Sequence, residues 1–433
     1  MNQSPPLSPS PAQPNPLAFD KSSLYTLIAA SLLLTETFSG ALRYYLDMAG
    51  VSWLLYLPKL ACLAAIAVEL PSYRANPLLW LALLGLLLST QLAMLHGADI
   101  RNLGFALFMY LPLLFGLFCG RHLEARLKLL VRVIGFCLLA SFVGIALDLF
   151  TSVPWKGYSY LLGNVELSGN RSWGMEDIDR IGGFARMSTS LSVMIAMYSL
   201  FLAAFTRSRL ARLLLYAASL AAIVLSTNKS TMAAYVLTLL ILVIAAYRFA
   251  SASAFLFAVL GGIALPFASL VLNLEPHTAT SRSMLASFAD RLVNSWPNFI
   301  AELVGSGWGW LGAGFGAVGS GAATFPIPGI ELLAIADSTA LYLWGMLGVL
   351  GIGLYLLQFG LLLRLQARDT RLRNALLGCA YCVCLIGWAT DIPEVTVATL
   401  FLGLAAAHAL APTRTGLRLG TLPAAAQWQG ERS

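Results

Sequence analysis

Apolar runs close to the length of a membrane-spanning helix recur along the whole chain. A helix needs about 20 such residues to cross the hydrocarbon core of a bilayer. Of the 433 residues, 58% are hydrophobic and 11% are charged, whereas soluble globular domains carry about 25% charged residues. Because so few charged residues cannot cover a surface in water, the sequence predicts a protein whose helices are surrounded by lipid.

We expect an all-α polytopic membrane protein with about twelve transmembrane helices. The predicted spans lie at residues 22–42, 53–70, 78–95, 103–120, 127–150, 187–205, 210–225, 231–247, 255–274, 339–363, 375–389 and 395–410. They form a transmembrane domain over 22–411, followed by a tail over 412–433. The first segment, 1–21, is polar and proline-rich, which predicts a disordered tail rather than a signal peptide.

Basic residues cluster in alternate short connections, at 121–128, 206–212 and 364–373. Cytoplasmic loops carry such an excess of lysine and arginine. The pattern therefore predicts that both termini are cytoplasmic and that two long loops, 151–186 and 275–338, are periplasmic, in the inner membrane of a bacterium. The net charge of +7 follows from this topology signal, so we expect no nucleic-acid partner.

Several cations lie on the outward side against this bias. Guanidinium groups bind phosphate oxygens in pairs, so these residues indicate a lipid phosphate or pyrophosphate ligand. The alternative is contact with lipid headgroups and surface ion pairs, and for Arg171 and Arg282 it is equally favoured. For Lys229, in a very short turn between two spans, the functional interpretation is favoured. The candidate pyrophosphate or substrate ligands are Arg180, Arg186, Lys229 and Arg291.

Asp337 is the candidate general base. It follows an apolar stretch at the start of the span predicted over 339–363, where partial loss of hydration would favour its protonated form. The alternative is that Asp337 or Ser338 caps this helix, and a cap is compatible with catalysis. Other candidates for the base are Glu331 and His277.

Other motifs point to packing rather than chemistry. Cys379, Cys382 and Cys384 lie within one apolar span, where buried thiols are expected rather than a metal site or a disulfide. The sequence 307–312 matches a dinucleotide-binding pattern, but no strand precedes it, so a glycine-rich turn is expected. The pair Asp177 and Asp179 is a weak metal signal. We expect no metal ion and no cofactor.

Four segments together resemble a known family. They are 180–188 (RIGGFARMS), 225–231 (LSTNKST), 290–296 (DRLVNSW) with the glycines that follow it, and 336–351 (ADSTALYLWGMLGVLG). Their order and spacing resemble the O-antigen ligase and polymerase superfamily, the Wzy- and WaaL-like membrane glycosyltransferases. The match covers residues 175–360.

The chain departs from the family pattern at two places, and the first departure, the missing histidine, favours a polymerase over a ligase. Ligases of this family usually carry histidine and then asparagine where this chain has Asp337 and Ser338. Lys229 stands where arginine is commoner. The resemblance therefore favours a polymerase of a bacterial exopolysaccharide or O-antigen.

The resemblance implies a GT-C-like glycosyltransferase that transfers glycan, without a metal, between two undecaprenyl-pyrophosphate-linked oligosaccharides. In this scheme Asp337 accepts the acceptor proton, and the four cations neutralise the leaving pyrophosphate. A flippase and a chain-length regulator are the implied partners in the bilayer. The alternatives are a ligase-type transferase that moves polymer to another acceptor, and a precursor transporter or flippase. The sequence shows no clear internal repeat of the kind common in transporters.

Overall fold

The computed structural model describes residues 20–162, 165–168, 174–175, 178–244, 247–272, 286–367 and 370–410. Within these ranges the regular structure is helical apart from four short strands. The tails predicted at 1–21 and 412–433 lie almost entirely outside the described residues, as do Arg171, Asp177, His277 and Arg282.

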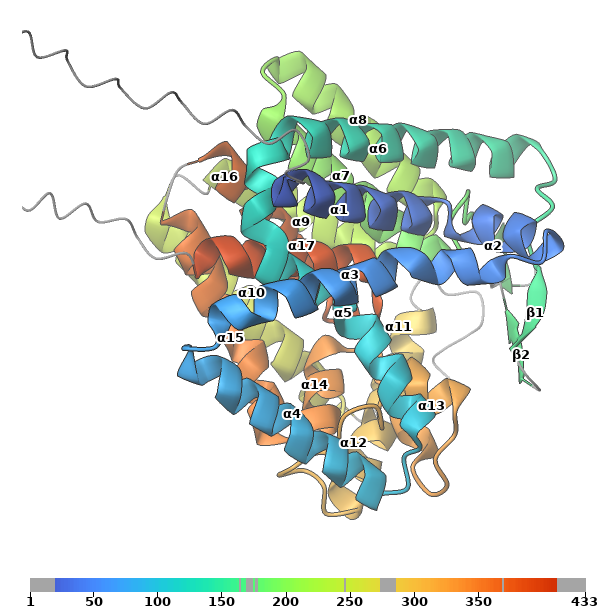
Figure 1. The fold of residues 1–433 in the computed structure, drawn as a ribbon, viewed down its shortest axis with the longest axis vertical. Coiled ribbons are helices and arrows are strands. Elements are labelled where there is room, and N and C mark those ends of the chain that lie inside the picture. The colour runs from blue at the N-terminus through green and yellow to red at the C-terminus, as the bar shows by residue number, and fades with distance from the viewer. Residues whose placement is uncertain are drawn as a thin grey trace, which may run out of the picture.

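The first half of the chain is dominated by long helices (Figure 1). Its elements are α1 (Lys21–Thr37), α2 (Ser39–Met48), η1 (Ser52–Tyr56), α3 (Leu57–Glu69), η2 (Leu70–Tyr73), α4 (Pro77–Leu95), α5 (Ile100–Leu123), η3 (Glu124–Arg126), α6 (Leu127–Phe150), α7 (Ser188–Phe205) and α8 (Arg209–Leu225). Between α6 and α7 lie two hairpins, formed by β1 (Ser159–Leu162) with β2 (Val165–Ser168) and β3 (Gly174–Met175) with β4 (Ile178–Asp179).

The second half mixes long and short helices. Its elements are α9 (Lys229–Ile244), α10 (Arg248–Ala268), α11 (Ala286–Asp290), the π-helical η5 (Arg291–Ser295), α12 (Trp296–Gly305), α13 (Ser320–Thr324), η6 (Glu331–Ala334), α14 (Thr339–Leu347), α15 (Val349–Gln366), α16 (Arg371–Ile386), η7 (Ile392–Glu394) and α17 (Thr396–Ala409).

Every predicted span overlaps a helix or two consecutive helices. By length and apolar composition, six helical segments among the described residues are able to cross a membrane, or seven if α1 and α2 count as one. One of them, Ile100–Phe150, has 51 residues and contains α5 and α6, between which the chain turns at η3 (Figure 1). The protein is therefore a multi-pass α-helical membrane protein, and the count of about twelve spans stays a prediction.

Two of the predicted spans are broken rather than continuous. Between α1 and α2 the chain bends by 85°. The span predicted over 339–363 breaks at Gly348, which has a φ of 60°. A Cβ atom at Gly348 would lie 2.0 Å from the carbonyl oxygen of Trp310, and Val349 donates a hydrogen bond to that oxygen. The glycine-rich loop thus packs against the break, an approach that only glycine permits.

The predicted second long loop, 275–338, also contains regular structure. α11, η5 and α12 follow one another without a gap from Ala286 to Gly305. Further along, the φ of Gly314 is 107°, and a Cβ atom there would lie 2.4 Å from the backbone nitrogen of Ala93 in α4. This close packing agrees with the glycine-rich turn expected from the sequence.

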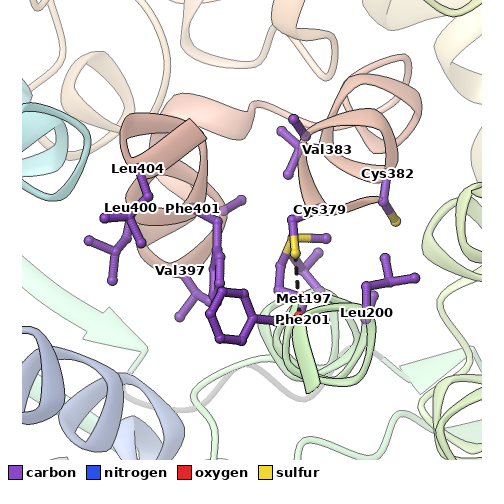
Figure 2. Packing of buried hydrophobic residues seen from close by; sticks show 14 of the residues in the cluster. Met197, Leu200, Phe201, Cys379, Cys382, Val383, Val397, Leu400, Phe401 and Leu404 are labelled. Carbon is purple, nitrogen blue, oxygen red and sulfur yellow. Dashed lines mark hydrogen bonds between the residues drawn. The ribbon is translucent and has the colours of Figure 1, made fainter. Parts of the chain in front are cut away.

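The main core lies where α7, α16 and α17 meet. Figure 2 shows Phe201 of α7 facing Phe401 of α17, with ring centroids 5.4 Å apart. The Cys379 thiol of α16 donates to the carbonyl oxygen of Met197, 3.5 Å away. All six cysteines are buried and unoxidised. A helix that is apolar around its whole circumference belongs inside a bundle, which is where α16 lies.

Hydrogen bonds between helix ends show which ends lie together. Lys21 at the start of α1 binds Glu69 at the end of α3, and Arg121 near the end of α5 donates to Ala407 near the end of α17. The two ends of the described chain therefore lie on one side. On the other side, α14 begins beside the end of α16, because Thr339 donates its backbone N–H to Gly387. α7 and α9 also begin next to each other. We call this side the loop end.

Candidate functional site

Asp337 lies at the loop end, immediately before the residue that flanks the start of α14. Its φ is 48°, a left-handed conformation that is uncommon for residues other than glycine. The backbone N–H groups of Asp337 and Ser338 donate to the two carboxylate oxygens of Asp391, at 3.2 and 3.0 Å. Ser338 makes no side-chain capping bond. Ser338 is therefore the N-cap residue of α14, as the sequence predicts, but Asp391 and not a side chain of Asp337 or Ser338 supplies the carboxylate that accepts at this helix start.

Arg291 holds the side chain of Asp337. Its Nη2 donates to Oδ1 at 3.3 Å, and its Nε lies 3.2 Å from Oδ2 without the alignment of a hydrogen bond. Trp296 donates its indole N–H to the backbone carbonyl of Asp337 at 3.4 Å. Arg291 opens the π-helical turn between α11 and α12, and such turns are frequent at functional sites. The helical segment of the second long loop thus fixes Asp337 from two sides.

Arg180 interacts electrostatically with Arg291. It is half-buried, and this burial, together with the positive charge of Arg291, lowers the pKa of its guanidinium. Of the residues singled out in the sequence, the structure therefore pairs Arg291 with Asp337 directly and links Arg180 to Arg291 through its charge.

Two further carboxylates at this site were not predicted. Asp391 and Glu394 lie in the short connection between α16 and α17. Burial, followed by the charges of Glu394 and Asp337, raises the pKa of Asp391 well above its ordinary value. Glu394 accepts hydrogen bonds from the backbone and the hydroxyl of Ser320. The available sequence signal was two acidic residues within the five-residue connection between two predicted spans.

Arg186 is positioned by contacts of its own. The segment that joins it to Arg180 is held by Asp148, whose Oδ2 accepts from the N–H groups of Gly182 and Gly183 at 2.9 and 3.0 Å. The N–H of Arg186 itself donates to Ser39 at 3.1 Å. The charge of Arg186 acts on Lys59 of α3.

Lys229 is the first residue of α9, and its side chain is exposed. The predicted short turn between two helices is present, because α8 ends at Leu225 and α9 begins at Lys229, but the Lys229 side chain is not buried between them. Asn228 takes up the turn instead, because its Oδ1 accepts from the hydroxyl of Ser230 and the N–H of Thr231. The hydroxyl of Ser192 in α7 donates to that of Thr231, so Lys229 still lies at the loop end.

The site offers ionic and hydrogen-bonding chemistry. Within the part of the chain that the structure describes, there is no group of three or more histidine, cysteine, aspartate or glutamate side chains suited to a metal ion. Asp177, one of the two aspartates that gave the weak metal signal, lies outside the described residues. What the described residues can do is bind an anion with two guanidinium groups and exchange a proton at a carboxylate.

No protein-family model matches this sequence, and no curated protein matches it. The fold defines the class as a multi-pass helical membrane protein. The ionic group at its loop end, formed by Arg180, Arg291, Asp337 and Asp391, is the candidate functional site.

Proposed function

We propose that the protein polymerises undecaprenyl-pyrophosphate-linked repeat units into a bacterial exopolysaccharide or O-antigen, on the periplasmic side of the inner membrane. The observation that carries this proposal is the carboxylate of Asp337, paired with Arg291, whose charge also acts on Arg180. A carboxylate beside two cations suits a reaction that releases both a proton and a pyrophosphate. Three of the four segments that resemble the ligase and polymerase superfamily contain these same residues.

In the proposed reaction, a hydroxyl oxygen of the acceptor glycan attacks the anomeric carbon of the donor. The bond from that carbon to the phosphate oxygen breaks, and undecaprenyl pyrophosphate leaves with the electron pair. The hydroxyl proton passes to Asp337. Arg180 and Arg291 neutralise the charge that develops on the pyrophosphate. Arg186 and Lys229 remain candidates for contacts elsewhere on the substrates.

The pairing of Arg291 with Asp337 suggests how binding prepares the base. Arg291 also donates to the carbonyl and the hydroxyl of Ser287, so its guanidinium is held in place. Pyrophosphate oxygens that bind Arg291 would compete with the Asp337 carboxylate for its N–H groups. Asp337 would then be free to accept the proton of the acceptor hydroxyl, while Asp391 continues to hold its backbone.

The test is deletion of the protein from its native bacterium, followed by extraction of lipid-linked glycans. A polymerase predicts that polymer is lost and that single lipid-linked repeat units accumulate, open to a membrane-impermeant oxidant in spheroplasts. Accumulation of long lipid-linked polymer would instead indicate a ligase. Single units protected from the oxidant would indicate a flippase or transporter. Unchanged polymer and unchanged intermediates would contradict all three.

The orientation has its own test. In a variant without native cysteines, single cysteines at Ser168 and Ala322 should react with an impermeant thiol reagent added from outside. Cysteines at Ser208 and Ala367 should react only after the membrane is opened. The reverse pattern would place Asp337 on the cytoplasmic side and contradict the proposed reaction.

A further inference from the structure

The glycine-rich loop that follows α12 exposes large apolar side chains. Trp310 is 79% exposed and Leu311 is 71% exposed, and Val304 at the end of α12 is 57% exposed. No charged residue occurs between Glu302 and Glu331 in the sequence. Contiguous apolar side chains on a protein surface mark a site of interaction with a partner or with a membrane. The loop therefore needs an apolar partner rather than water.

The backbone of this loop is fixed, so the fold itself keeps these side chains at the surface. The carbonyl oxygen of Gly309 accepts the indole N–H of Trp344 at 2.9 Å. The carbonyl oxygen of Trp310 accepts the N–H of Val349 at 3.0 Å. Because the backbone is bonded to the end of α14 and the start of α15, the exposure of Trp310 and Leu311 is a property of an ordered loop.

The same loop packs against the end of α4. The ring of His96, directly after α4, stacks on the ring of Trp308, with centroids 4.2 Å apart and planes at 22°. Nδ1 of His96 lies 2.8 Å from the carbonyl oxygen of Ala313. Leu95, the last residue of α4, is 82% exposed. The loop and the end of α4 therefore form one continuous surface.

α4 indicates which environment this surface faces. It is long and apolar enough to cross a membrane, and only 17% of its most apolar stretch is buried. An apolar helix with so few protein neighbours faces lipid. It begins at Pro77, shortly after Glu69, which lies beside the start of α1. A helix of 19 residues that starts there reaches the opposite edge of the hydrocarbon core at Leu95. The surface that includes Trp310 and Leu311 thus continues the lipid-facing side of α4 to the edge of the bilayer.

Tryptophan is the residue suited to that edge. Trp and Tyr are enriched where lipid tails meet water, because an indole ring is apolar while its N–H can bind a polar headgroup. We propose that Leu95, Val304, Trp310 and Leu311 form an anchor that holds the second long loop in the headgroup region of the membrane. The partner is the lipid surface.

The anchor is joined to the candidate functional site by continuous helix. α12 follows η5 without a gap, and η5 opens with Arg291. Trp296, the first residue of α12, donates to the carbonyl oxygen of Asp337. If the proposed function holds, on which this step alone rests, the anchor sets the position of Arg291 relative to the lipid surface, where the pyrophosphate of a lipid-linked glycan lies.

The experiment measures the depth of single introduced cysteines in lipid nanodiscs that contain the full-length protein. Each cysteine carries a bimane fluorophore. The quenchers are lipids with a nitroxide near the headgroup, lipids with a nitroxide at the end of the acyl chain, and iodide in the water. The six native cysteines are buried, so the unsubstituted protein supplies the labelling background. Trp310→Cys and Leu311→Cys should lose most fluorescence with the nitroxide near the headgroup.

Two further variants calibrate the depth. Leu84→Cys lies in the middle of α4, where the leucine is 51% exposed, and should be quenched most by the nitroxide at the end of the acyl chain. Asp290→Cys replaces an exposed carboxylate in the same long loop and should be quenched by iodide alone.

Three results would overturn the proposal. Quenching of Trp310→Cys and Leu311→Cys by iodide alone would show that the loop faces water. Strongest quenching by the nitroxide at the end of the acyl chain, as in Leu84→Cys, would place the loop within the hydrocarbon core. Protection from all three quenchers would show that another protein surface, such as a second copy of the chain, covers the loop.

These outcomes are independent of enzyme activity. Headgroup quenching in a protein whose deletion leaves polymer unchanged keeps the anchor and removes the polymerase. A polymerase deletion phenotype combined with quenching by iodide alone keeps the polymerase and removes the anchor.

Discussion

At the end of the bundle where the described chain begins and ends, the carboxylate of Glu69 is surrounded by donors, whereas the carboxylates at the loop end lie beside one another. Glu69 is 5% exposed and accepts from the hydroxyl of Tyr25 at 2.7 Å and the ammonium of Lys21 at 3.0 Å. His122 lies 3.6 Å away. At the loop end, Asp337 and Glu394 both raise the pKa of Asp391, and Asp337 adopts a left-handed backbone.

Arg373, at the same end as Glu69, is also satisfied locally. It is buried and donates to the carbonyl groups of His408 and Arg364. His408 lies in the last turn of α17, where a cation also interacts favourably with the helix dipole. These charges fasten helix ends and need no further ligand.

The comparison separates two kinds of charged groups. Those at the Glu69 end stabilise the fold, whereas those at the loop end are held in place by the fold and lower its stability. Repelling groups and uncommon backbone conformations persist where the surrounding structure imposes them, and they concentrate at functional sites. On this argument, substitutions at the loop end should impair activity with little loss of stability. Substitutions around Glu69 should do the opposite.

The largest effect is expected for Asp337→Asn. Asparagine tolerates a positive φ nearly as well as aspartate, so the backbone should keep its conformation. Loss of the general base should reduce polymerisation by about a hundred- to ten-thousandfold, with lipid-linked repeat units accumulating. Polymer yield from purified protein and the amount of folded protein in membranes measure the two effects.

The matched control is Asp290→Asn, an exposed carboxylate next to Arg291 in the chain that accepts from Asn294. It should retain nearly full activity. Asp337→His should retain part of the activity if the position exchanges a proton. Full polymer yield from Asp337→Asn would remove the base from this residue and direct attention to Asp391, Glu331 or His277.

Arg291→Ala is expected to have the next largest effect. Hydrogen bonds to charged groups contribute roughly 1.5–3 kcal/mol, so turnover or affinity should fall by about ten- to a few-hundredfold. Arg291→Lys should recover only part of the loss, because an ammonium lacks the paired donors of guanidinium. Arg101→Ala, at an exposed cation near the start of α5, is the control. Unchanged turnover in Arg291→Ala would place the pyrophosphate elsewhere.

Some of the residues on which these predictions rest can be identified from the sequence, and others cannot. Apolar length marks the helices, and the four family-like segments point to Asp337 as a base and to four cations as anion ligands, namely Arg180, Arg186, Lys229 and Arg291. Asp391 cannot be identified in this way, because its carboxylate accepts hydrogen bonds from backbone N–H groups that lie 53 and 54 residues away in the sequence. Such a contact depends on how α14, α16 and α17 pack, and no periodicity along the chain reports it.

The turn before α9 is a further case. The side chain of Asn228 orders this turn, because its Oδ1 accepts from the hydroxyl of Ser230 and the N–H of Thr231. The side chain of Lys229 is therefore exposed, although the connection is short.

Glu69→Gln tests the other side of the comparison. The hydroxyl of Tyr25 would lose an ionised acceptor in a buried place, which should lower the free energy of unfolding by about 1.5–3 kcal/mol. The ammonium of Lys21 is more than half exposed, so its share should be small. Thermal unfolding in detergent measures the loss, and polymer formed per folded molecule should stay constant. Glu124→Gln, at an exposed carboxylate of the same end, should change neither quantity.

A reduced activity per folded molecule in Glu69→Gln, at unchanged stability, would contradict the division between the two ends. It would show that a fully satisfied charge can still take part in function.

The smallest effect concerns the pH dependence of stability at Asp391. Its pKa in the folded protein is raised above the ordinary value of 3.8. At pH values between the ordinary and the raised pKa, the folded state therefore binds more protons than the unfolded state. Stability from this group is therefore present at low pH and is lost as pH rises toward the raised pKa. One group changes the free energy of unfolding by at most about 1.4 kcal/mol per pH unit.

Asp391→Asn should remove this slope, because asparagine does not titrate yet keeps one acceptor for the start of α14. Unfolding temperatures of both proteins between pH 4 and 8 measure the difference in slope, with Asp290→Asn as the control for an exposed carboxylate. Parallel curves for the parent and Asp391→Asn would mean that the loop-end carboxylates do not strain one another, and the contrast with Glu69 would lose its electrostatic basis.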